Sequence, residues 1–298
     1  MSSVPSLSDL TAAELAEPVD PRVTDLAAAI AARYGDAARA VLFYGSCLRQ
    51  RELGGLMLDF YLIVSGYRAA YGRSWLALAN ALVPPNVFAV EHRGLVAKYA
   101  VLSEADLARE CSQAARSTSV WARFAQPSRL VWASDESARA AAVEAVAQAA
   151  PTLFALTRPA MAEGRRDDPL AVFRDGFGLT YGAELRAERR ERPASIVDAD
   201  PERYRRFGEA IIARQAVAAD GERAARRRWR SRQRKGKAMT LVRLLKASTT
   251  FAGGIDYLAW KINRHAGTDI RLKPWQRRWP LVAALTLLPR LLKRGAIR

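Results

Sequence analysis

Cysteine and histidine are both scarce in this chain of 298 residues, which contains two of each. Cys47 and Cys111 stand in ordinary sequence, without a CxxC pair or a nearby histidine, so neither a disulfide framework nor a zinc site is indicated. His92 and His265 have no partner near them in the sequence, and we expect them to be solvated rather than catalytic. These absences favour a reduced, cytoplasmic setting.

Long apolar runs are missing as well. The N-terminus is polar, with acidic residues and no apolar stretch behind a basic start, which argues against a secretory signal. The run LVAALTLLPRLL at 281–292 is interrupted by Pro289 and Arg290, and it is too short to span a bilayer, since a spanning helix needs about 20 apolar residues. We expect this run to lie in the membrane interface; the alternative is a buried C-terminal core helix.

Acidic residues are nearly absent from the C-terminal quarter. Residues 221–298 contain 21 Lys and Arg against 3 Asp and Glu, a net charge of +18, whereas residues 1–220 contain 26 against 27. Such a block attracts a polyanion, either nucleic acid or an anionic lipid surface. Trp275 and Trp279 suit the headgroup level of a bilayer, where each nearby cation adds about 1 kcal/mol on anionic lipid. The sequence therefore predicts a basic, amphipathic tail that binds the inner face of the cell membrane peripherally.

One stretch within this block leaves a nucleic-acid alternative open. In ARRRWRSRQRKGK at 225–237, a single Trp stands among many cations, and an aromatic ring can stack a base while the cations hold phosphates. On this interpretation the chain would be a nucleotidyltransferase acting on RNA or another phosphorylated acceptor. The apolar run at 281–292 favours lipid, because an RNA-binding protein gains nothing from it, and we expect no nucleic-acid partner.

The hydrophobic pattern predicts an α+β protein with an α/β domain at 1–103, a helical domain at 104–220, and the tail at 221–298. Strands are expected at 40–44, 56–64, 87–90 and 95–102. Helices are expected at 22–33, 74–82, 103–116, 118–125, 135–149, 151–163, 168–192 and 200–217. Asp135 or Ser134 is the expected cap of the helix at 135–149, and the polar run 220–237 is expected to be a link.

A carboxylate inside an apolar strand is the most informative feature of the first domain. Residues 42–64 read LFYGSCLRQRELGGLMLDFYLIV, with Asp59 inside the second apolar run, and a buried carboxylate without a partner is costly. A strand, the Gly45-Ser46 turn and a second strand with an acid form the core of a nucleotidyltransferase site. There the glycine lets backbone approach a triphosphate, the serine hydroxyl holds phosphate oxygens, and the acid binds Mg²⁺. Arg49 lies in the link, where it could meet a phosphate.

The pattern is incomplete, because a nucleotidyltransferase strand usually carries two acids at alternate positions that face one side. The second position here is Tyr61, so a second acid must come from elsewhere. The alternatives are a turn followed by an Asp that caps or pairs with an Arg, or a non-catalytic basic membrane adaptor on the same fold.

Four short motifs resemble, in their order, those of the mitochondrial-type phosphatidate cytidylyltransferase family, also described as translocator-maintenance proteins. The motifs are YGS at 44–46, LDFYLIV at 58–64, KYAVLS at 98–103 and LTYGAELR at 179–186, followed by Ile196-Val197. The resemblance covers residues 40–210 and suggests a compact, bacterial-like member. Cys47 stands where the family has the second glycine of YGSG, and Glu184 stands where it has Asp.

The resemblance implies a Mg²⁺-dependent transferase of phospholipid biosynthesis, a CTP:phosphatidate cytidylyltransferase that forms CDP-diacylglycerol and pyrophosphate. By position, the residues implied in nucleotide binding are Tyr44, Gly45, Ser46, Arg49 and Arg186, those implied in catalysis are Asp59, Lys98 and Glu184, and those implied in metal binding are Asp59 and Glu184. Read without the family, Lys98 is a solvated strand lysine, and Glu184 and Arg186 belong to ion pairs at helical spacing.

Overall fold

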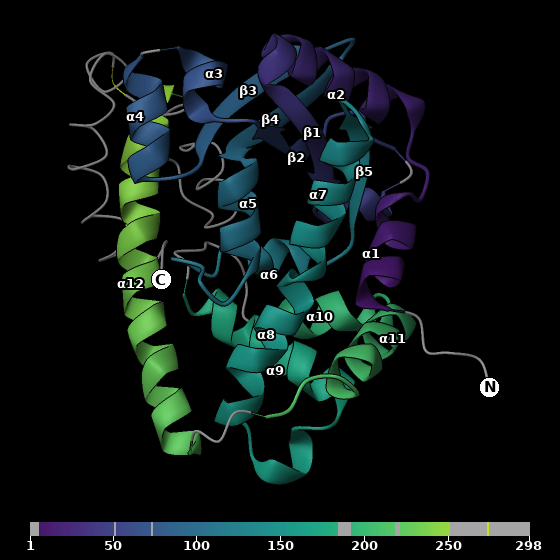
Figure 1. Ribbon diagram of the computed structural model, residues 1–298, viewed down its shortest axis with the longest axis vertical. Helices are drawn as coiled ribbons and strands as arrows, with labels where there is room; N and C mark the ends of the chain where they lie inside the picture. The colour runs from purple at the N-terminus through teal and green to yellow at the C-terminus, as the bar shows by residue number, and fades with distance from the viewer. Residues whose placement is uncertain are drawn as a thin grey trace.

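The computed structural model describes residues 6–50, 52–72, 74–183, 192–217, 221–250 and residue 273. Within these residues the protein is a mixed α+β structure, as the sequence predicts, with a five-stranded sheet covered by helices on both faces (Figure 1). The strands are β1 (Ala38–Tyr44), β2 (Met57–Val64), β3 (Asn86–His92), β4 (Leu95–Ser103) and β5 (Ser128–Ala133).

The α-helices precede, connect and follow these strands. They are α1 (Leu7–Leu15), α2 (Pro21–Ala32), α3 (Tyr67–Tyr71), α4 (Trp75–Leu82), α5 (Glu104–Cys111), α6 (Trp121–Phe124), α7 (Glu136–Ala147), α8 (Ala149–Thr157), α9 (Pro169–Tyr181), α10 (Arg192–Asp198), α11 (Pro201–Ile212) and α12 (Glu222–Thr250). Asp135 caps α7, because its side chain accepts a hydrogen bond from the Ala138 amide, and the cap predicted from the sequence is confirmed.

The sheet has the strand order β3-β4-β2-β1-β5. Neighbouring strands run antiparallel except β2 and β4, which run parallel and are joined by a crossover through α3, α4 and β3. A tight turn at Arg93 and Gly94, both with positive φ, joins β3 to β4. The parallel pair at the centre of the sheet brings side chains from β2 and β4 side by side although they are far apart in the chain.

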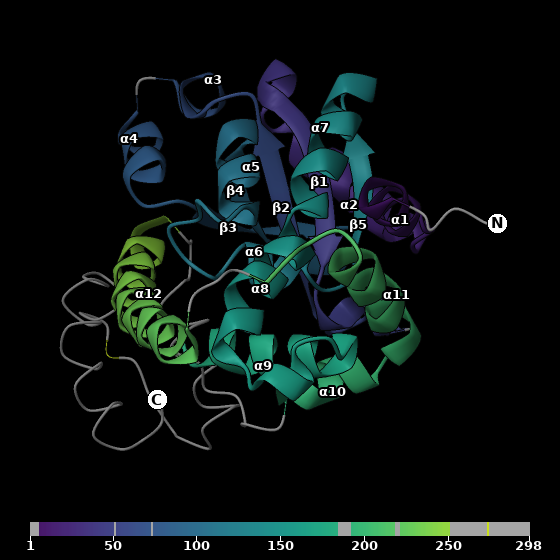
Figure 2. The same cartoon turned by 60° about the horizontal axis from the view of Figure 1, so that its bottom comes forward.

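Alternate residues of the strands face two different apolar layers. On one face, Val41, Phe60 and Val101 pack with helix α2. On the other face, Leu42 and Ile63 pack with the helices that follow the sheet, in a cluster that extends from α1 to α12. Figure 2 shows α5 and α7 on this second side, with α8 to α11 beyond them. The sheet and the helical part of the chain therefore share one core.

Several segments differ from the sequence prediction. Helices α1, α3 and α10 were not predicted, and two further differences concern the sheet and the basic segment. The strand β5 was missed: its six residues lie between Ala-rich segments, and they extend the sheet by pairing with β1. The polar run 220–237, predicted to be a link, belongs to the 29-residue helix α12. Arg, Lys, Gln and Ala are good helix formers, so a run without an apolar stripe still forms a helix when it has something to pack on.

One described stretch, Glu136–Ala160, is long and apolar enough to cross a membrane by length and composition. It comprises α7, α8 and the turn after them, and 56% of its most apolar window is buried within the protein. This burial is what a core helix of a globular protein would show, so the stretch is weak evidence for a membrane span.

A buried ion pair between Glu14 and Arg203 connects helix α1 to helix α11. Arg203 donates to both carboxylate oxygens of Glu14, at 2.6 and 3.0 Å, and a further nitrogen donates to the Ala125 carbonyl at 2.8 Å. The two side chains are 5% and 8% exposed. The guanidinium also lies over the rings of Tyr204 and Phe207, so every face of it is occupied.

We expect Arg203→Met to lower the free energy of unfolding by about 3 to 5 kcal/mol, because it leaves the Glu14 carboxylate buried without its cation. Urea unfolding followed by circular dichroism measures the change. The control is Arg205→Met on the same helix, whose pair with Glu202 is exposed and which should change stability by no more than about 1 kcal/mol. Equal effects of the two substitutions would contradict a structural role for the buried pair.

Candidate active site

Asp59 and Lys98 form an ion pair at the centre of the sheet. They face each other in the parallel register of β2 and β4, and the Lys98 Nζ atom lies 3.0 Å from Asp59 Oδ1. The two side chains are 23% and 25% exposed, in that order, so the pair is accessible from one side. The structure thus brings together two of the predicted catalytic residues, 39 positions apart in the chain.

Gly45 covers the other oxygen of this carboxylate. It follows β1, whose last residue, Tyr44, pairs with Asp59 across the antiparallel strands. The backbone of Gly45 has φ 97°, and a Cβ atom built on it would lie 3.3 Å from Asp59 Oδ2. Glycine is needed here for its conformation and for the short distance between backbone and carboxylate. Ser46 comes next and is exposed.

The Asp59 carboxylate has one oxygen left without a hydrogen bond. Oδ1 is buried and accepts none from the described residues, although the Lys98 ammonium is close to it. The described residues contain no group of three or more His, Cys, Asp or Glu that could hold a metal ion. Mg²⁺ is commonly bound by one or two carboxylates together with substrate phosphates. A single carboxylate paired with an ammonium could contribute one ligand to such a nucleotide-borne ion, once the lysine shifts, and among the described residues it does not make a site that holds an ion alone.

Tyr61 explains why the strand carries one acid. It lies on the same face of β2 as Asp59, is 3% exposed, and packs against Tyr44 and Phe124 with ring centroids 5.2 Å apart in both cases. The position at which a second strand carboxylate would stand is therefore part of the apolar core. A second acid at this site would have to come from another element.

A tyrosine and an arginine complete the described surroundings of Asp59. Burial first, and then the charge of Asp59, raise the pKa of the Tyr44 hydroxyl well above its ordinary value, while Arg123 beside it acts in the opposite direction. Tyr44 therefore stays protonated at neutral pH and can act as a hydrogen-bond donor. The Arg123 guanidinium also donates to the Ser119 carbonyl. Arg123 was not predicted, because nothing in the WARF segment distinguishes it from a surface arginine.

Cys47 is turned away from the site. It is buried in the apolar layer that faces α2, and its thiol donates to the Met57 carbonyl at 3.6 Å. Burial is the main cause that raises the pKa of the thiol, and the charge of Asp59 is the second. The charge of Lys98 lowers this pKa by a smaller amount. The thiol is therefore protonated and not nucleophilic at neutral pH.

Several predicted residues lie outside the described part of the chain. These are Glu184, Arg186, His265, Trp275, Trp279 and the run 281–292, together with the side chain of Arg49. His92, which the sequence led us to expect in solvent, is instead within 3.3 Å of an Asp25 carboxylate oxygen.

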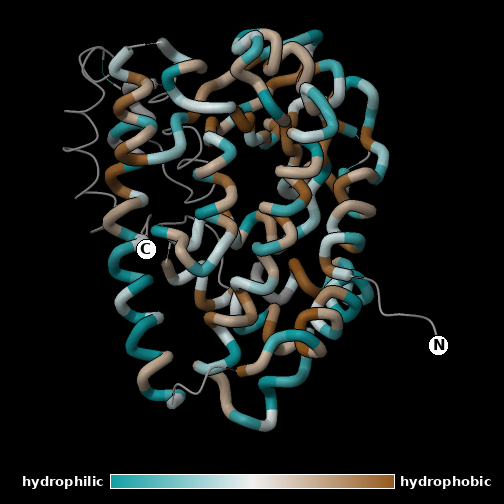
Figure 3. Tube along the Cα trace, viewed as in Figure 1, coloured by the Kyte–Doolittle hydropathy of each residue, from teal (hydrophilic) through white to brown (hydrophobic). Residues whose placement is uncertain are grey.

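Trp229 is a core residue of α12 and is not available to stack a base. Its side chain is 3% exposed, its ring lies edge-on to Trp121 with centroids 6.3 Å apart, and its indole nitrogen donates to the Leu156 carbonyl at 2.7 Å. One turn further on, Gln233 donates to the Leu179 carbonyl at 3.1 Å. These contacts hold the N-terminal half of α12 against the helical part, although most residues of that half are hydrophilic (Figure 3).

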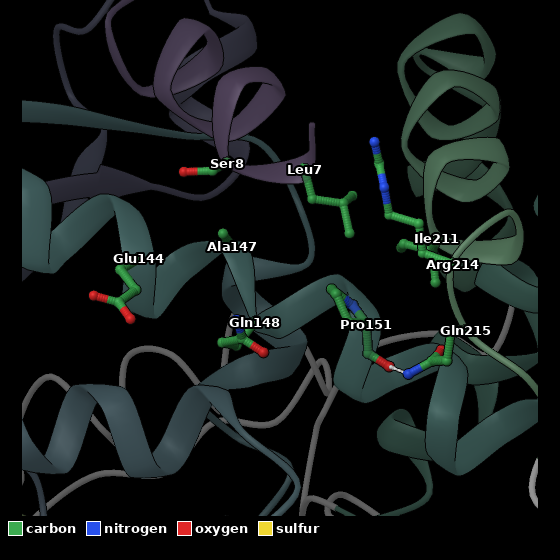
Figure 4. A pocket seen from close by; sticks show the side chains of 9 residues that line it. All are labelled: Leu7, Ser8, Glu144, Ala147, Gln148, Pro151, Ile211, Arg214 and Gln215. Carbon is green, nitrogen blue, oxygen red and sulfur yellow. Dashed lines mark hydrogen bonds between the residues drawn. The ribbon is translucent and has the colours of Figure 1, made fainter. Parts of the chain in front are cut away.

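A pocket of about 340 Å³ lies away from these residues, between α1, α7, α8 and α11 (Figure 4). None of the predicted site residues lines it. Glu144 and Arg214 stand on opposite walls, and the amide of Gln215 donates to the Pro151 carbonyl at 3.3 Å. No pair of reactive groups converges there, so Asp59 and Lys98 remain the better candidates for chemistry.

No family model matches this sequence, and no curated protein matches it. The observations that bear on function are therefore the geometry around Asp59 and the motifs in the sequence.

Gly45→Ala tests whether the approach of this backbone to Asp59 matters for function. Gly72 provides a matched control. Like Gly45, it has a positive φ with an extended ψ, but a Cβ atom built on it would have no atom within 4 Å. Each substitution should cost about 1 to 3 kcal/mol of stability through backbone strain. We expect only Gly45→Ala to abolish nucleotide binding, measured by calorimetry with CTP and Mg²⁺. Equal binding by the two variants would show that the Gly45 contact has no functional role.

Proposed function

We propose that this protein is a nucleotidyltransferase, a CTP:phosphatidate cytidylyltransferase that forms CDP-diacylglycerol and pyrophosphate at a membrane surface. The observation that carries the proposal is the Asp59–Lys98 pair directly beside Gly45 at the end of β1. A nucleotidyltransferase site needs a glycine turn, a strand carboxylate and a cation for phosphate, and these three lie together here. The antiparallel β1–turn–β2 unit supports a nucleotidyltransferase-like fold.

The chemistry requires little covalent assistance from the protein. In the proposed reaction, a phosphate oxygen of phosphatidate attacks the α-phosphorus of CTP in line, and the bond to pyrophosphate breaks. A phosphate monoester carries an oxyanion at neutral pH, so the reaction needs no strong general base. Positioning and charge stabilisation then supply most of the rate.

Each described residue has a role in this proposal. Asp59 would hold Mg²⁺, which when bound supplies positive charge for the developing charge on the leaving pyrophosphate. Lys98 would exchange part of its contact with Asp59 for a phosphate oxygen. Gly45 and Ser46 would contact the triphosphate, and Tyr44 would act as a donor at the same place. Glu184 and Arg186 are proposed as the second metal ligand and a phosphate contact from the segment that follows α9.

The tail and the location of the protein belong to the same proposal. The basic segment after residue 221 and the apolar run at 281–292 would hold the protein peripherally on the inner, cytoplasmic face of a membrane, where phosphatidate is found within the bilayer. The substrates would then reach the site from two phases, CTP from water and phosphatidate from lipid.

Two other functions remain as alternatives. A nucleotidyltransferase acting on RNA or another phosphorylated acceptor would use the cations of α12, but the burial of Trp229 removes the aromatic platform that the sequence offered. A non-catalytic membrane adaptor is the other alternative, since in it the Lys98 ammonium would serve only to neutralise the single strand carboxylate with which it is paired. An adaptor would show no turnover, whereas either enzyme would release pyrophosphate. The two enzymes differ in the acceptor that supports turnover, phosphatidate or RNA.

Asp59→Asn should abolish turnover and leave the fold intact, since it keeps the shape of the side chain and removes the charge that would hold Mg²⁺. The assay supplies Mg²⁺, each of the four nucleoside triphosphates in turn, and either phosphatidate in detergent or single-stranded RNA, and follows pyrophosphate. Asp36→Asn, at an exposed position, is the control and should retain wild-type turnover. Activity of Asp59→Asn above about a tenth of wild type, a loss of less than about 1.4 kcal/mol of transition-state stabilisation, contradicts the metal role.

Glu184→Gln should also disable the enzyme, because the proposal needs a second acid that the strand does not provide. The same pyrophosphate assay, run over a range of Mg²⁺ concentrations, separates a metal role from a structural one. A lost metal ligand raises the Mg²⁺ concentration required for half-maximal turnover, whereas a structural defect lowers turnover at every concentration. Wild-type behaviour of Glu184→Gln would remove Glu184 from the site.

A further inference from the structure

Helix α4 exposes its largest apolar side chains and buries its polar one. Trp75, Leu78 and Leu82 are 56%, 63% and 64% exposed, and their spacing of three and four places them in one stripe along the helix. The opposite side carries Ala77 and Asn80, which are buried. A surface helix normally has the reverse arrangement, with its apolar stripe facing the core.

The buried side of α4 is fixed by hydrogen bonds, so the stripe cannot turn inward. The Asn80 amide nitrogen donates to the Val101 carbonyl of β4 at 2.9 Å, and its oxygen accepts from the Asn86 amide at the start of β3. Asn86 returns a hydrogen bond to the Leu76 carbonyl at 3.1 Å. These contacts hold α4 on the edge of the sheet in one orientation. An outward apolar stripe held in this way is a surface for contact with something else.

The segments next to α4 carry cations. Residues 60–90 contain two Arg and no Asp or Glu, and Arg243 and Lys246 of α12 contact the end of α4. Helix α12 lies beside the end of α4, as Figures 1 and 2 both show. Arg243 donates to the Pro84 carbonyl at 2.8 Å, and Lys246 donates to the Val83 carbonyl.

Val242 of α12 is a further exposed apolar side chain. It is 44% exposed and precedes Arg243, which binds the segment that follows α4. Four of the five large apolar side chains that the described residues expose belong to α4 or to this part of α12; the fifth is Val96 of β4. The stripe formed by Trp75, Leu78 and Leu82 is called the α4 surface below.

We propose that the α4 surface inserts into the headgroup and upper acyl region of an anionic bilayer. The observations favour lipid over protein as the occupant. The stripe has no charged side chain of its own, Arg243 and Lys246 bind the segment at its end, and its tryptophan suits the interface. This assigns to the sheet domain a membrane contact separate from the one proposed for the tail, and it holds whatever reaction occurs at Asp59.

Such a contact would fix the orientation of the protein on the membrane. A tail alone tethers a protein without orienting it, whereas a rigid helix packed against β3 and β4 sets the angle of the sheet to the bilayer. Lys98 lies on β4, three residues before Val101, which holds Asn80. The α4 surface therefore connects the membrane to the strand that carries one of the candidate catalytic residues.

The test measures co-sedimentation of the full chain with vesicles of phosphatidylcholine and phosphatidylglycerol. Replacing Leu78 and Leu82 together with serine should weaken binding about ten-fold or more, since each exposed leucine contributes apolar area that the bilayer would bury. Val96→Ser, an exposed apolar position on β4 outside the stripe, is the matched control and should bind as wild type. Wild-type binding by the double variant would overturn the proposal.

A second measurement keeps the proposal testable if the double variant fails to fold. In the wild-type chain, lipids brominated on their acyl chains should quench Trp75, and Trp75→Phe should remove part of the total quenching. Equal quenching of wild type and Trp75→Phe would overturn the proposal. That result is expected if residues 251–298 or a second copy of the chain cover α4 and keep lipid away from Trp75. Loss of self-association by the double variant, with unchanged vesicle binding, would identify a protein interface instead and would also overturn it.

Turnover on a water-soluble phosphatidate should be unaffected by Leu78→Ser and Leu82→Ser, so failure of this proposal is distinct from failure of the proposed reaction.

Discussion

The contact between Asp59 and Lys98 depends on the parallel register of β2 and β4, and much of the surrounding structure follows from it. Parallel pairing places the two side chains directly opposite each other, so the carboxylate has a cation without any help from the loops. Gly45 then packs against the other oxygen, where a Cβ would crowd it. A partly buried carboxylate is tolerated when one of its oxygens is paired with a cation and the other is packed against backbone. Tyr61, on the same face of β2, packs in the core with Tyr44 and Phe124.

The sequence predicts the parts of this arrangement that depend on local pattern. Apolar alternation and the glycine turn locate β1 and β2, and Asp59 stands out because it interrupts an apolar run. The sequence alone does not predict the partner of Asp59, since a parallel pairing between positions 59 and 98 leaves no local mark; Lys98 was singled out by family resemblance. Strand β5 was missed because SRLVWA is short and is flanked by helical segments. Arg123 was missed because its role arises from where α6 lies.

Helix α12 shows why charge and sequence position are incomplete guides to domain limits. Its eleven cations against one acid suggest a segment detached from the fold, yet Trp229 is buried against Trp121 and Leu156. Arginine and lysine have long apolar stems and several donors, so a basic helix can pack and also cap carbonyls, as Arg243 does at Pro84. Residues 221–250 of the predicted tail are therefore part of the folded body, continuous with the core that begins at α1.

The position of α12 in the chain has a consequence for synthesis. Its partners among the described residues, from Val83 after α4 to the Leu179 carbonyl on α9, precede it in the chain. During translation the sheet and the helices after it emerge from the ribosome first, and the edge of Trp121 stays uncovered until residue 229 has left the exit tunnel. We expect the nascent chain to expose this apolar surface during the interval, when a chaperone or a membrane would find it most accessible. Helix α12 thus covers Trp121 only after all its described partners have been synthesised.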